Sequence, residues 1–101
     1  MKPVADCNNL DDVRNAIDEI DSKIINLLGQ RFHYVKETVR YKEKDKASII
    51  AKERLETVIR SRRKLAEENG LNADIIEKIY RLLIEYFINE ELNLIDKQKE
   101  V

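Results

Sequence analysis

One apolar pattern near the start of the chain constrains its fold more than any other feature. From Leu10 to Val39, hydrophobic residues recur at spacings of three and four, the repeat of an amphipathic helix. No proline interrupts this segment, and Gly29 costs a helix only about 1 kcal/mol relative to alanine. The stripe consists of Leu10, Val13, Ile17, Ile20, Ile24, Leu27, Leu28, Val35 and Val39.

A helix of this length cannot be covered by the rest of its own chain. About 30 residues at 1.5 Å per residue give a helix of about 45 Å. A compact domain of about 100 residues has a radius of gyration of only about 13 Å. The whole chain has 101 residues, which is enough for one small domain. The apolar stripe therefore needs a second chain, and we expect a homodimer.

Capping residues mark the other helix boundaries. Asn9 or Asp11 can cap the first helix, Ser48 the second and Asn72 the third. Gly70 follows the second helix where a left-handed backbone conformation is needed. These signals predict a single all-α domain over residues 1–101 with three helices per chain: a long helix over about residues 10–42, a polar lid loop over 43–50, a helix over about 51–69 and a helix over about 73–96.

The composition excludes several classes of protein. Nineteen basic residues balance twenty acidic ones, so the net charge of −1 gives no argument for a nucleic-acid partner. No apolar run reaches the length of about 18 residues that a membrane span needs, and the first ten residues lack the apolar core of a signal peptide. We therefore expect a cytoplasmic protein with no membrane partner. Cys7 is the single cysteine, and metal-ligand spacing is absent.

Charged residues on apolar faces are the candidates for function. Arg31 and Lys42 are eleven residues apart, so on a continuous helix they point within about 20° of each other. Arg14 points elsewhere on that helix, but in a dimer it can reach the pair on the other chain. Glu91 follows Phe87 by four residues on the apolar stripe of the third helix, where an unpaired carboxylate is costly. The four charges indicate a pocket for a small polyanion; alternatively, they are structural, with Glu91 paired to Arg31.

Most other charged residues are typical of solvated helix faces. His33 has no second histidine and no nearby cysteine with which to form a catalytic triad. Glu53 suits the positive end of the second helix dipole. We interpret six further basic residues as solvated: Lys36, Arg40, Arg60, Arg62, Arg63 and Lys64.

Four segments together resemble the all-helical chorismate mutase family (chorismate mutase type II). They are DCNNLDDVRNAIDEID, RFHYVKETVRYK, ERLETVIRSRRKLAEENGLNADIIEKIY and LLIEYFINEE, which cover nearly the whole chain. The DC before the first helix and the YVK…RYK pattern are most similar to the isochorismate pyruvate lyase branch, which makes salicylate for siderophores. The resemblance implies an intertwined homodimer with two sites, each completed by an arginine from the other chain.

The resemblance also implies a role for five residues. Arg14 would bind a substrate carboxylate across the dimer, and Arg31 would bind the other carboxylate. Lys42 would contact a carboxylate and the ether oxygen of the substrate, while Glu53 would contact the ring hydroxyl in a mutase. Glu91 matches the hydrogen-bond donor to the ether oxygen, which is glutamine in the lyases and the bacterial mutases. Because a carboxylate anion cannot donate, we expect the active form of Glu91 to carry a proton.

The implied reactions are pericyclic, so we expect no metal, cofactor or covalent intermediate. The substrate would be a small dicarboxylate: isochorismate, which gives salicylate and pyruvate, or chorismate, which gives prephenate. Lys52 and Ile49 depart from the bacterial mutases, and Glu91 departs from the lyases, so both activities stay open. An alternative of another class is a non-catalytic helical regulatory dimer. Such a dimer would be expected to lose the cation set, which this chain retains.

Overall fold

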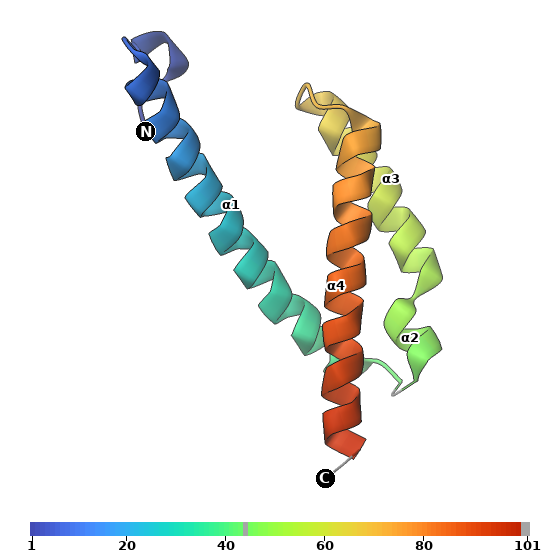
Figure 1. Ribbon diagram of the computed structural model, residues 1–101. Coiled ribbons are helices and arrows are strands. Elements are labelled where there is room, and N and C mark those ends of the chain that lie inside the picture. Colours follow the sequence, from blue (N-terminus) through green and yellow to red (C-terminus); the bar gives the residue numbers. More distant parts are fainter. Residues whose placement is uncertain (44, 100–101) are drawn as a thin grey trace. The chain divides into compact units, whose positions relative to one another are not determined.

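The computed structural model describes residues 1–43 and 45–99, and these residues are helical without any β-strand (Figure 1). This confirms the all-α prediction. The chain divides into two compact units, Met1–Tyr34 and Val35–Val101, which are described separately below. The elements are the 3-10 helix η1 (Val4–Asp6), α1 (Leu10–Thr38), the 3-10 helix η2 (Val39–Tyr41), α2 (Lys46–Ile50), α3 (Lys52–Glu68) and α4 (Ala73–Lys99).

The first unit consists of η1 and most of α1. The Asn9 side chain accepts a hydrogen bond from the Asp12 backbone N–H at 2.8 Å, which confirms Asn9 as a helix cap. Asp12 in turn accepts from the Asn8 backbone N–H at 3.0 Å and from Lys2 Nζ at 3.2 Å. The 29 residues of α1 form a helix of about 43 Å, and none of them is buried. This unit has no second layer of its own to bury the apolar stripe.

The α-helical part of the long helix ends at Thr38, before the predicted boundary near residue 42. The Thr38 hydroxyl donates to the Val35 carbonyl at 2.6 Å, a local bond that competes with regular helix geometry. One turn of 3-10 helix follows, and Lys42 is extended, with φ −105° and ψ 151°. The side-chain direction of Lys42 is therefore set by an extended backbone, and the rotation argument from Arg31 does not apply to it.

The segment that we expected to be a loop contains the short helix α2. Its cap is Asp45, whose side chain accepts from the Ser48 backbone N–H at 2.8 Å. The predicted cap at Ser48 is wrong, because Ser48 lies inside this helix. Ile49 is 1% exposed and anchors α2 to the apolar core. Ala51, with φ 47°, then separates α2 from α3 in a left-handed conformation.

The turn between α3 and α4 has the two caps that the sequence predicted. Gly70 has φ 72°, and the Gly70 and Leu71 backbone N–H groups donate to the carbonyls of Glu67 and Ala66, at 3.2 and 2.8 Å. This is a Schellman motif. The Asn72 side chain accepts from the Ile75 backbone N–H at 3.0 Å, which confirms the cap of α4.

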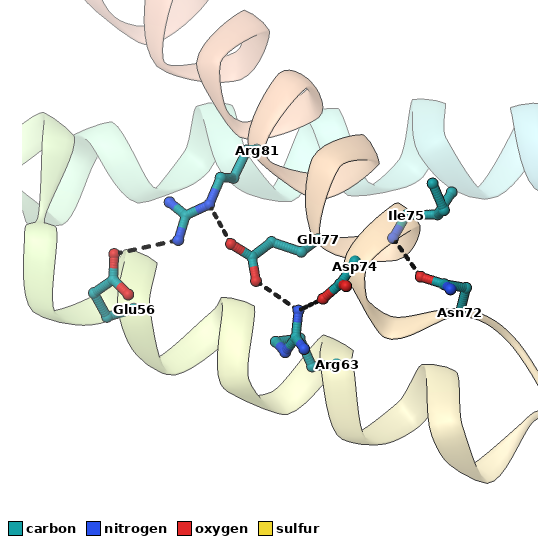
Figure 2. A network of polar contacts seen from close by, with 7 residues as sticks. All are labelled: Glu56, Arg63, Asn72, Asp74, Ile75, Glu77 and Arg81. Carbon is teal, nitrogen blue, oxygen red and sulfur yellow. Dashed lines mark hydrogen bonds and ion pairs between the residues drawn. The ribbon is translucent and has the colours of Figure 1, made fainter.

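A network of ion pairs joins α3 to α4 near this turn (Figure 2). Arg63 lies 2.9 Å from a carboxylate oxygen of each of Asp74 and Glu77, and Arg81 Nε lies 2.8 Å from the other Glu77 oxygen. Arg81 also lies 3.6 Å from Glu56 on α3. Hydrogen bonding to Arg81, and then to Arg63, lowers the pKa of Glu77. Arg63, which we interpreted as a solvated charge, is 36% exposed and in addition bridges the two helices.

Apolar packing in the second unit places α2 against α4. Val39, Ile49 and Ile95 form a buried cluster, with Ile88 and Leu92 packed against it. The cluster therefore joins η2, α2 and the second half of α4. Over the part of the chain that the structure describes, no helix has the length and hydropathy needed to cross a membrane.

Candidate active site

Glu91 is the one charged side chain among the buried residues that the structure describes, with 3% of its surface exposed. Phe87 precedes it by four residues and Ile95 follows it by four, and both are buried. This confirms that Glu91 lies on the apolar stripe of the third main helix. A carboxyl group in such surroundings is costly unless hydrogen bonds and a counter-charge compensate it.

Two side chains compensate this carboxyl group. Lys42 Nζ lies 3.0 Å from Glu91 Oε1, and the Thr38 hydroxyl donates to the same oxygen at 3.1 Å. Lys42 Nζ also donates to the Ile49 carbonyl at 3.4 Å, which ties it to α2. The side chain of Lys42 is 26% exposed, so part of it remains in contact with solvent. We call Thr38, Lys42 and Glu91 the Glu91 cluster.

The local chain path explains how these three residues meet. The 3-10 turn after Thr38 brings Val39 into the apolar cluster with Ile49 and Ile95. Glu91 lies one helical turn before Ile95, so the packing of Val39 on this part of α4 places Thr38 and Lys42 beside the carboxyl group. The result is an ammonium group and a hydroxyl held on one oxygen of a buried acid.

The two predicted arginines lie in the other unit, on α1. Arg14 is exposed and Arg31 is half-buried. Seventeen residues separate them, which corresponds to about 25 Å along the helix axis. That distance exceeds the span of a small dicarboxylate, so the two arginines of one chain cannot bind the same molecule.

The other predicted site residue in the second unit is Glu53. It lies in the first turn of α3, where its side chain is exposed. Of the site residues predicted in this unit, Lys42 and Glu91 are thus in direct contact, whereas Glu53 faces solvent.

Sequence reasoning assigned no role to Thr38. A signal was available, because Thr38 follows Val35 by three residues, which places both on the same face of α1. A threonine on such a face is usually read as a packing residue. Its bond to Glu91 spans 53 positions of sequence and appears only once the chain is folded.

A hollow of about 230 Å³ lies at the turn between α3 and α4. The Arg62 guanidinium lies 5.7 Å from the centre of the Tyr80 ring at this hollow. Tyr80 is eleven residues before Glu91, about 16 Å along α4. Because the lining is mostly apolar and carries one guanidinium, it offers no pair of groups suited to a small dianion. Its lining consists of Arg62, Leu65, Ala66, Asn69, Leu71, Ile76 and Tyr80.

Comparison with known protein families decides the classification. Residues 13–92 match the family described as chorismate mutase type II. The chain belongs to this family. The matched range contains all five predicted site residues, from Arg14 to Glu91.

The relatives of this chain include a protein named as a lyase and a protein named as a mutase. The chain is 41% identical over 92 residues to a protein of Pseudomonas aeruginosa named isochorismate pyruvate lyase, covering 91% of this chain and 90% of that protein. It is 34% identical over 77 residues to the chorismate mutase of Methanocaldococcus jannaschii, covering 76% of this chain and 78% of that protein. It is also 34% identical over 82 residues to the T-protein of Haemophilus influenzae, covering 80% of this chain but only 22% of that longer protein.

Proposed function

We propose that the protein is a pericyclic enzyme that converts isochorismate into salicylate and pyruvate, with chorismate mutase activity as a secondary reaction. The observation that carries this proposal is the 41% identity to an isochorismate pyruvate lyase along nearly the full length of both chains. The contact between Lys42 and the buried Glu91 supports it, because it supplies a cation beside a candidate hydrogen-bond donor.

The proposed site acts by positioning and by electrostatic stabilisation. A flexible dianion must be held in a reactive shape while negative charge builds on its breaking ether oxygen. Arg31 and Arg14 of the partner subunit bind the two carboxylates through paired hydrogen bonds. Lys42 and a protonated Glu91 donate to the ether oxygen. In the lyase reaction a hydrogen passes within the substrate as the C–O bond breaks, so no bond to the protein forms.

The proposed site requires an intertwined homodimer. The separation of about 25 Å between Arg14 and Arg31 on one helix supports this, because each arginine then serves a different site. The stripe of α1 supports it as well, since Ile17 is 50% and Leu27 is 60% exposed in the single chain. In the dimer this stripe would be covered by the second copy.

Two alternatives follow from the relatives and the residues. Chorismate mutase as the main activity is supported by the relative from M. jannaschii that bears this name. In that reaction Glu53 would contact the ring hydroxyl of chorismate. A non-catalytic regulatory dimer is the alternative of another class. The salicylate and siderophore pathway and the cytoplasmic location stay predictions from the resemblance and the composition.

One experiment separates these functions. The purified protein is incubated separately with isochorismate and with chorismate, and salicylate, pyruvate and prephenate are quantified. We expect salicylate and pyruvate in equal amounts from isochorismate, at a higher kcat/KM than prephenate from chorismate. A higher kcat/KM for prephenate would establish the mutase alternative. If the wild-type protein forms no product above an Arg31→Ala control, the regulatory alternative replaces the proposal.

A further inference from the structure

The two oxygens of the Glu91 carboxyl group differ in their contacts, and Thr38 contributes to this difference. Lys42 Nζ and the Thr38 hydroxyl both donate to Oε1 of Glu91, at 3.0 and 3.1 Å. Oε1 is a poor place for a proton, because the Lys42 ammonium group that faces it has no lone pair to accept that proton, and the Thr38 hydroxyl donates to the same oxygen. In the neutral acid the proton therefore belongs on the other oxygen, Oε2.

The position of the Thr38 hydroxyl is fixed by its own helix. It lies 2.6 Å from the Val35 carbonyl and 3.1 Å from Glu91 Oε1, so its single hydrogen is shared between two acceptors. The bond to Val35 restricts the rotation of the threonine side chain, which keeps the hydroxyl group within hydrogen-bond distance of Oε1.

We propose that Thr38 is a positioning residue which, with Lys42, keeps Oε1 of Glu91 as an acceptor, so that Oε2 carries the proton and donates it in a hydrogen bond to the substrate. This inference rests on the proposed function, in which Glu91 contacts the ether oxygen. Thr38 itself need not touch the substrate.

The same geometry suits either a glutamate or a glutamine at position 91. A glutamine would place its carbonyl oxygen toward Lys42 and Thr38, because its amide nitrogen cannot accept from either donor. Its amide group would then occupy the position of Oε2 and donate in the same direction. The two donors would thus orient either side chain.

Lys42 is a charged group in contact with Glu91, and Thr38 contributes a hydroxyl to it. On its own helix, the neighbours one turn away are the apolar residues Phe87 and Ile95. On α2, the backbone carbonyl of Ile49 accepts from Lys42. The Thr38 contribution can therefore be isolated while Lys42 remains in place.

The test uses Thr38→Val, which keeps the shape of the side chain and removes the hydroxyl, and Thr38→Ser, which restores the hydroxyl. Thr57→Val is a matched control, because the Thr57 hydroxyl also donates to a helix carbonyl, that of Glu53, on another helix. The first measurement is a 13C NMR titration of the Glu91 carboxyl carbon in the free, folded protein. It needs no substrate. Circular dichroism verifies folding, and Thr38→Ala replaces Thr38→Val if the valine variant does not fold.

We expect Thr38→Val to move the midpoint of the Glu91 titration upward by about one pH unit, the equivalent of one hydrogen bond to a charged group. Thr38→Ser should restore the wild-type midpoint, and Thr57→Val should leave it unchanged. A wild-type midpoint in folded Thr38→Val would overturn the inference, because the hydroxyl would then not act on the carboxyl group.

The second measurement is the pH dependence of kcat for salicylate formation. In Thr38→Val the alkaline fall in kcat should move upward by the same amount, and kcat at lower pH should drop severalfold as the carboxyl group loses its orientation. In a Glu91→Gln background, Thr38→Val should leave the pH dependence of kcat unchanged. An active enzyme whose pH profile is unaffected by Thr38→Val would refute the inference and leave the proposed function intact. A shifted titration in a protein that converts neither substrate would refute the proposed function alone.

Discussion

Replacing Lys42 with alanine should destabilise the protein because it removes an ammonium group that pairs with the buried Glu91 carboxylate. Glu91 is 3% exposed, and Lys42 lies 3.0 Å from it. Removing one partner of a buried ion pair costs about 3–5 kcal/mol. The Thr38 hydroxyl remains as a donor, and Lys42 is itself 26% exposed. The loss of stability should therefore lie at or below the lower end of that range. We expect Lys42→Ala to lower the free energy of unfolding by about 2–3 kcal/mol at pH 8.

The assay is urea denaturation at a fixed protein concentration, because the stability of a dimer depends on that concentration. With an m-value of about 1–3 kcal/mol per molar urea, the midpoint should fall by about 1 M or more. The double variant Lys42→Ala/Glu91→Gln should recover most of the stability, because the buried position is then neutral.

A matched control is the exposed ion pair of Arg40 with Glu37, whose nitrogen and oxygen lie 2.7 Å apart. The two side chains are 72% and 51% exposed, so Arg40→Ala should cost less than about 1 kcal/mol. If Lys42→Ala proved no more destabilising than Arg40→Ala at pH 8, the Glu91 carboxylate would not depend on Lys42. The contact between Lys42 and Glu91 would then contribute nothing measurable to the free energy of unfolding.

Four other outcomes are expected. Sedimentation at micromolar concentration should show a dimer, and a folded monomer of 11.9 kDa would contradict the argument from the length of α1. Arg31→Ala should abolish activity in an intact dimer. Refolding Arg31→Ala chains together with Arg14→Ala chains should restore some activity. Confirmed heterodimers without activity would exclude action of Arg14 across the interface. Glu91→Gln should remove the alkaline fall in turnover and keep the rate near neutrality, and a dead variant would exclude Glu91 as the donor. Because Arg81 lowers the pKa of Glu77 below its ordinary value of 4.5, the stabilisation from that ion network should be present above that pH and lost as the pH falls further. Glu77→Gln should remove this acid-dependent loss in urea titrations, and an unchanged pH dependence would contradict the role of Glu77.

Local chemistry determined how much of the fold the sequence could predict. Asn9, Gly70 and Asn72 act within one helical turn of their own positions, so their caps were predicted correctly. The burial of Glu91 followed from its spacing to Phe87, which is also a local property of one helix.

Features that depend on distant contacts were missed. We expected Ser48 to be a cap, whereas Asp45 caps α2, a helix whose Ile49 packs against a helix more than 40 residues away. Thr38 looked like an ordinary residue of a helix face because its partner Glu91 is remote in sequence. The ion pairs of Arg63 were missed for the same reason, since its carboxylate partners lie on the next helix.

The distance between Arg14 and Arg31 along one rigid helix has a consequence for how the proposed enzyme behaves in a cell. In the proposed dimer a lone chain holds no complete site, so catalytic competence depends on the encounter of two chains. Specific activity should therefore decline on dilution below the dissociation constant of the dimer, even though every chain remains chemically intact. Where expression is low, the output of the enzyme would rise more steeply than its abundance. The spacing of two side chains on α1 would thus make gene dosage a determinant of metabolic flux.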